Sequence, residues 1–141
     1  MSRREIRDSA FKLMFEKLLR EDSIETLYRI VEEEEIDEII LNKQVREMVD
    51  GTLAHAEELD SIIAKYSKTR ALHRIPKLNL AILRIALYEI LYDEGTPQNA
   101  AINEAVELAK NYTYQEDVSF INGLLGAYAR DHAEPQKAEN A

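Results

Sequence analysis

Three arginines stand at the beginning of the chain, at positions 3, 4 and 7. In a helix, Arg3 and Arg7 lie one turn apart and Arg4 lies three residues before Arg7, so the three side chains share a face. The helix dipole disfavours cations at a helix N-terminus, which suggests that the cluster has another use. Because a planar guanidinium group fits phosphates and base edges, the spacing supports contact with RNA or DNA. The alternative is pairing with nearby carboxylates, such as Asp8 with Arg4.

No other pattern in the sequence indicates chemistry. The histidines at positions 55, 73 and 132 are widely separated, and no glycine-rich phosphate-binding loop or local Ser/His/Asp signature is present. The chain has no cysteine, which excludes a disulfide framework, a thiolate metal site and a cysteine nucleophile. The sequence therefore predicts a protein that is not an enzyme and that uses no cofactor and no metal ion.

The charge is unevenly distributed along the chain. The net charge of −9 argues against bulk affinity for nucleic acid. Residues 1–20 and 61–92 are nevertheless basic, whereas residues 21–60 and 93–141 are acidic. If the two basic blocks meet in space, they form a local anion-binding face. The alternative is that solvated helix faces simply vary in charge.

The composition favours an all-α domain. Only four glycines and three prolines occur in 141 residues, so little of the chain is suited to turns. No apolar run is long enough to span a membrane, and the charged N-terminus does not resemble a signal peptide, so we expect a cytoplasmic protein. Apolar residues recur at helical spacing, which predicts helices over residues 3–20, 24–34, 43–66, 76–93, 99–111 and 118–130.

Four local features refine these predicted helices. Asp22 is expected to begin the second helix through a capping box with Glu25, and Asn42 is expected to cap the third. Gly51 lies inside the third helix, where a glycine is unfavourable, so we expect close packing against a neighbour there. The fourth helix is apolar over much of its circumference, which predicts a central position in the C-terminal half. Residues 111–117 are expected to form a loop.

Four segments together resemble the NusB family of transcription antitermination factors. They are RREIRDSAFKLMF (3–15), ILRIALYEI (82–90), PQNAAINEAVELAK (97–110) and FINGLL (120–125). Their order and spacing match, and the resemblance covers nearly the whole chain. It implies an all-helical fold of two packed helical subdomains, about 1–70 and about 71–132, followed by a flexible tail, 133–141.

The resemblance also implies a function without catalysis. Members of the family bind the boxA sequence of nascent RNA together with NusE, a small-subunit ribosomal protein. With other Nus factors, the pair helps RNA polymerase to read through terminators, chiefly in ribosomal RNA operons. The expected partners are therefore boxA RNA, NusE and the RNA polymerase elongation complex, and no cofactor is expected.

The family motifs assign roles to particular residues of this chain. The residues expected to bind RNA are Arg3, Arg4, Arg7, Arg84, Lys110, Phe120 and Asn122. The residues expected to face NusE are Phe15 and Asn79. Phe120 suits base stacking, but the sequence is equally consistent with a core position. The acidic residues next to it, Glu116 and Asp117, are expected to moderate RNA affinity.

Three other interpretations remain open on the sequence. NusB-like domains also precede the catalytic domains of ribosomal RNA methyltransferases, so the chain could be a detached accessory RNA-binding domain. It could instead be a protein-binding helical module whose acidic residues 21–60 meet a basic partner. A homodimer that hides the arginine face is the third interpretation.

Overall fold

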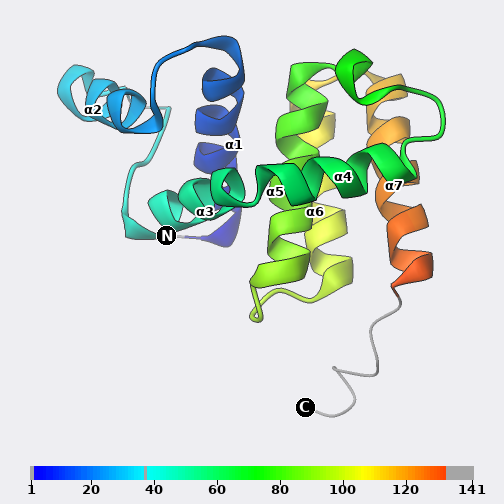
Figure 1. The fold of residues 1–141 in the computed structure, drawn as a ribbon. Coiled ribbons are helices and arrows are strands. Elements are labelled where there is room, and N and C mark those ends of the chain that lie inside the picture. The colour runs from blue at the N-terminus through cyan, green and yellow to red at the C-terminus, as the bar shows by residue number, and fades with distance from the viewer. Residues whose placement is uncertain (1, 37, 133–141) are drawn as a thin grey trace.

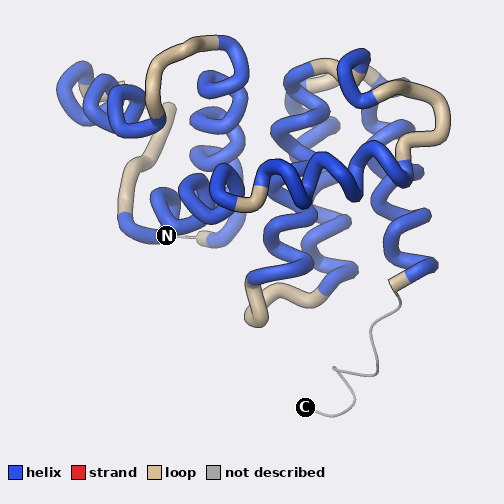
Figure 2. The backbone as a smooth tube through the Cα atoms, in the orientation of Figure 1, coloured by secondary structure: helices blue, strands red, loops and turns tan. Residues whose placement is uncertain are grey.

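The computed structural model describes residues 2–36 and 38–132, and this part of the chain is all-helical (Figures 1 and 2). The predicted tail, 133–141, lies outside the described residues. The helices, with one 3₁₀ turn named η1, are α1 (Arg3–Leu19), α2 (Ile24–Glu34), α3 (Lys43–Ala54), α4 (Ala56–Tyr66), η1 (Leu72–Arg74), α5 (Lys77–Tyr92), α6 (Gln98–Tyr112) and α7 (Gln115–Asp131). No strand occurs among the described residues, which confirms the predicted fold class. No helix in the described ranges is both long and apolar enough to cross a membrane.

Side chains that bond to free backbone N–H groups define where the first helices begin. Ser2 and Glu5 form a capping box at the start of α1. The expected capping box of α2 is wrong, because Ser23 is the N-cap residue and its hydroxyl accepts from the N–H of Thr26 at 3.2 Å. Asp22 instead pairs with Arg20 at 2.8 Å. A hydroxyl one residue later therefore takes the place of the predicted carboxylate.

The single helix predicted over residues 43–66 is wrong, because the structure divides it into α3 and α4. Asn42 caps α3 as expected, its side-chain oxygen accepting from the N–H of Val45 at 2.9 Å. The helix ends at His55, whose backbone has left the helical region (φ −107°, ψ 15°). Helix α3 packs on α1 and α5, whereas α4 packs on α5 and α7. The apolar spacing continues from α3 into α4, so it did not indicate the break at His55.

Gly51 allows α3 to approach α5 closely. A Cβ atom added at this position would overlap the ring and hydroxyl of Tyr88. The close packing predicted for Gly51 is thereby confirmed, and α5 is the neighbour.

Helix α5 is the centre of the molecule, as its apolar sequence predicted. It packs against α1, α3, α4, α6 and α7, and its Leu83 and Leu87 are fully buried. Helix α1 runs antiparallel to α5, because Arg3 lies beside Asp93 and Arg7 lies beside Glu89. Figure 1 shows α1–α3 on one side of the molecule and α4–α7 on the other. The division into two subdomains near residue 70 remains a prediction. Helix α4, which precedes residue 70, packs against α5 and α7 of the C-terminal half.

Candidate nucleic-acid interface

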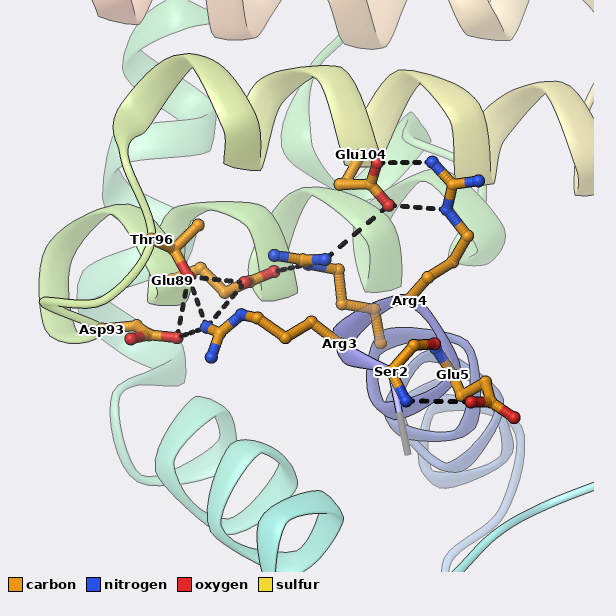
Figure 3. A network of polar contacts seen from close by, with 9 residues as sticks. Ser2, Arg3, Arg4, Glu5, Glu89, Asp93, Thr96 and Glu104 are labelled. Atoms are coloured by element: carbon orange, nitrogen blue, oxygen red, sulfur yellow. Dashed lines mark hydrogen bonds and ion pairs between the residues drawn. The ribbon is translucent and has the colours of Figure 1, made fainter.

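The N-terminal arginines all reach α5, α6 or the turn between them, where they meet carboxylates (Figure 3). Arg7 forms the most buried of these pairs. Its Nε donates to Oε1 of Glu89 at 2.7 Å, and the two side chains are only 8% and 1% exposed. A second guanidinium nitrogen lies 3.7 Å from Glu104. Arg7 therefore fixes α1 to α5 and has little surface left for a ligand.

Arg3 and Arg4 form more exposed pairs at the edge of this cluster. Arg3 donates to the carboxylate of Asp93 and to the hydroxyl of Thr96, and its side chain is 53% exposed. Arg4 binds Glu104 through two parallel hydrogen bonds of 2.9 and 2.8 Å, and its side chain is 71% exposed. Both guanidinium groups can still be approached from solvent.

The alternative that the N-terminal arginines pair with carboxylates is confirmed, but the expected partner within α1 is wrong. Asp8 does not pair with Arg4. It binds Lys12 at 2.8 Å and accepts from the Tyr112 hydroxyl at 2.6 Å. The carboxylates that neutralise the arginines lie more than eighty residues away in the sequence, on α5, on α6 and in the turn between them. Helix spacing within α1 could not reveal them.

The pairing keeps two of these carboxylates ionised. Hydrogen bonds from Arg4 lower the pKa of Glu104 below its usual range, against a smaller opposing effect of burial. Burial raises the pKa of Asp93, but hydrogen bonds from Thr96, the Gly95 N–H and Arg3 outweigh it, so that the net shift is downward. The cluster is therefore close to electrically neutral at pH 7.

Two further cations predicted to bind RNA are also paired. Arg84 forms two hydrogen bonds with Asp60 of α4, at 2.8 and 2.7 Å, and its side chain is only 12% exposed. Lys110 lies 3.1 Å from Glu107 on the exposed face of α6. Arg84 thus joins α5 to α4, whereas Lys110 is accessible.

Phe120 lies on α7 at the end of the bundle where α5 begins, and its ring is half-buried. The guanidinium group of Arg70 lies 4.4 Å from the ring centroid, within the range of a cation–π contact. The Phe120 ring is thus neither fully buried in the core nor fully exposed to solvent. Asn122 is exposed on the same helix.

Asn79, expected to face NusE, lies in the interior. Its side chain is fully buried and its Nδ2 donates to Asp117 at 3.0 Å, while its Oδ1 has no partner among the described residues. Arg70 donates to the same Asp117 oxygen at 3.0 Å. Burial raises the pKa of Asp117, but the bonds from Asn79 and Arg70 outweigh this effect and lower it. Asn79 is therefore not exposed for direct contact with a partner, and it holds Asp117, which is partly exposed.

Phe15, the other residue expected to face NusE, is half-buried on α1. Its ring stacks on Phe11 with centroids 6.3 Å apart. Because α1 and α5 are antiparallel, Phe15 lies toward the N-terminal end of α5, the end that carries Asn79.

The structure keeps the N-terminal arginines apart from Arg70 of the second basic block. Arg3 lies at the C-terminal end of α5, whereas Arg70 lies beyond its N-terminal end, and a helix of 16 residues is about 24 Å long. Sequence reasoning missed Arg70, although it lies in the block 61–92 whose net positive charge was the available signal.

The fold and this surface define a small all-helical protein with accessible cations and a half-buried aromatic ring on α7. No group of three metal-ligating side chains occurs within residues 2–36 and 38–132. The chain belongs to the NusB family, whose model matches residues 4–130.

Named relatives and solved structures agree with this membership. The transcription antitermination protein NusB of Acetivibrio thermocellus is 43% identical over 130 residues, which is 89% of this chain and 87% of the relative. The structure of T. maritima NusB has a TM-score of 0.81 and 30% identity, over 99% of this chain and 98% of that one. NusB in a complex of antitermination factors NusB and NusE with double-stranded RNA has a TM-score of 0.76 and 28% identity, over 92% and 96% of the two chains.

Proposed function

We propose that the protein is a non-catalytic RNA-binding adaptor in transcription antitermination, which binds boxA RNA together with NusE. The observation that carries the proposal is its membership of the NusB family along almost the whole chain. A solved NusB structure of closely similar fold is a complex with NusE and RNA. Through these partners the protein would act on the RNA polymerase elongation complex with other Nus factors, in the cytoplasm.

The surface described above suits such a role. Arg3, Arg4 and Lys110 have accessible side chains, so a phosphate can approach them without unfolding the helices. Phe120 and Asn122 supply an aromatic ring and an amide on α7, the kinds of group that bind unpaired bases. Arg7 and Arg84 are largely buried in pairs, and we assign them the positioning of α1 and α5.

Fluorescence anisotropy of a labelled boxA RNA tests the proposal. The control is a scrambled RNA of the same length, and both are titrated with and without NusE at two salt concentrations. We expect tighter, sequence-selective binding when NusE is present. Equal binding of both RNAs in every condition would overturn the proposal and favour a protein-binding module. Size-exclusion chromatography of the protein alone determines whether it forms a homodimer.

A further inference from the structure

Residues 67–77 join α4 to α5 and include the first residue of α5, and most of their positive charges have no carboxylate partner among the described residues. This connector contains Lys68, Arg70, Arg74 and Lys77 and no aspartate or glutamate. Lys68, Arg74 and Lys77 are exposed, and their side chains form no ion pair or hydrogen bond with any residue that the structure describes. Every cation that the sequence predicted to bind RNA is, by contrast, already paired with a carboxylate.

Pairing matters for RNA binding because a paired cation must exchange one anion for another. A phosphate that binds Arg4 has to displace or share Glu104, which reduces the net gain. A phosphate that binds an unpaired lysine releases only water and counterions. Per cation, phosphate binding to the connector is therefore more favourable in free energy than phosphate binding to the N-terminal cluster.

Arg70 joins the connector to the aromatic ring on α7. Its guanidinium lies over Phe120, and its bond to Asp117, which Asn79 also holds, fixes its position. The Arg70 side chain is 25% exposed, so its surroundings leave part of it open to solvent. Unpaired bases stack on guanidinium planes as well as on aromatic rings. A side chain that is already fixed loses little conformational freedom when a base stacks on it.

We propose that the connector 67–77 and Phe120 form an RNA-binding surface of this chain. Arg70 and Phe120 contact an unpaired base by stacking, and Lys68, Arg74 and Lys77 bind the flanking phosphates. Figure 1 shows the connector at the end of the bundle where both α5 and α7 begin, so these groups lie on one end of the molecule. This inference rests on the proposed function and adds residues that the family motifs did not assign.

A pair of charge-matched double variants tests the phosphate contacts. Lys68→Gln with Arg74→Gln is compared with Arg29→Gln with Lys43→Gln, which removes the same charges from exposed positions on α2 and α3. The probe is the labelled boxA RNA with NusE present, titrated at several salt concentrations. We expect the connector variant to reduce the salt slope by about 1.4, or about 0.7 for each lost contact. Equal slopes in the two variants would overturn the phosphate assignment.

Two single variants test the stacking contact. Arg70→Lys keeps the charge but removes the planar group, and we expect RNA binding to weaken by about fivefold or more. Phe120→Leu keeps an apolar side chain in place of the ring and gives an independent measurement if the Arg70 variant is unstable. Thermal unfolding monitored by circular dichroism confirms that each variant is folded. Wild-type affinity in both folded variants would overturn the stacking assignment.

The outcomes separate this inference from the proposed function. If the wild-type protein binds neither RNA, with or without NusE, the proposed function fails and the inference fails with it. If the wild-type protein binds boxA RNA selectively but the connector variants match their controls, only the inference fails.

Discussion

The beginning of α1 and the connector 67–77 are both basic in sequence, but the fold treats their charges in opposite ways. Arg3, Arg4 and Arg7 each meet a carboxylate of α5, of α6 or of the turn between them. Lys68 and Arg74 in the connector meet none among the described residues. The first region uses its cations to attach α1 to the rest of the molecule, and the second leaves them for solvent or a ligand.

This contrast shows that the number of charges in a segment does not measure its capacity to bind anions. Three guanidinium groups and three carboxylates compensate one another at the start of α1, so its remaining field is weak. In the connector, Arg70 pairs with Asp117, but Lys68, Arg74 and Lys77 have no carboxylate partner among the described residues. The available charge depends on contacts between distant parts of the chain, and variants can test each side of the comparison.

The largest expected effect is on stability, from Arg7→Ala. The substitution leaves Glu89 buried without its main partner, which costs about 3–5 kcal/mol of the free energy of unfolding. Urea unfolding measures the change. In the connector, Lys68→Ala removes an exposed side chain and should change stability by less than about 0.5 kcal/mol. If the two variants were equally stable, the structural role of the arginine cluster would be wrong.

A compensated variant sharpens the interpretation of Arg7. Replacing Arg7 and Glu89 together by leucine removes both buried charges and keeps apolar volume. We expect this double variant to recover most of the lost stability, because apolar pairs often replace buried ion pairs without loss. The same double variant separates folding from RNA binding. Because it is folded and lacks Arg7, its affinity for boxA RNA, compared with that of the wild type, shows whether Arg7 contacts RNA.

The next effect concerns the buried amide that supports the connector. Asn79→Ala removes one hydrogen bond to Asp117 and should cost about 1–3 kcal/mol. Asn99→Ala is the matched control, because Asn99 is exposed on α6 and its loss should cost less than about 0.5 kcal/mol. Both values come from urea unfolding. A neutral Asn79 variant would mean that the position of Asp117 does not depend on Asn79.

The pH dependence of stability distinguishes the paired region from the unpaired one. The pKa of Glu104 is lowered in the folded protein from an ordinary value of 4.5, mainly by Arg4. Its contribution is therefore complete above the ordinary value and is lost as the pH falls through the folded value. Glu104→Gln should lose less stability than the wild type between pH 7 and about pH 3. Unfolding at both pH values measures this, and Lys68→Gln, which alters no carboxylate, should follow the wild type.

Local features of the sequence predicted most of the fold. The bounds of α1 and α2, the Asn42 cap, the close packing at Gly51 and the central position of α5 follow from apolar spacing, capping chemistry and residue size. The break at His55 did not, because the apolar pattern of α3 continues into α4 without interruption. Helix α7 begins at Gln115 rather than at 118, since its first turn is polar and showed no apolar repeat.

The candidate site was less predictable, for a physical reason. Residue types identified Arg3, Arg4 and Arg7 as a cluster, but their partners Glu89, Asp93 and Glu104 are distant in sequence. In the same way, nothing local shows that Asn79 is buried or that Arg70 covers Phe120. Pairing and burial arise from tertiary contacts, so the sequence revealed which groups are charged but not which of them are available.

The smallest expected effect connects the two regions through RNA binding itself. Glu104→Gln removes the negative charge that pairs with Arg4 and keeps a side chain of similar size. Arg4 then becomes available to phosphate. We expect boxA affinity to rise by about two- to fivefold, the value of an exposed ion pair. Glu33→Gln is the control, since it removes an exposed carboxylate of α2 that has no arginine partner among the described residues and lies outside both basic regions. Affinity is measured by anisotropy at low salt, where screening is weak. If Glu104→Gln raises affinity no more than Glu33→Gln does, release of Arg4 adds nothing beyond the change in net charge, and the connector is the stronger candidate for the principal phosphate contact.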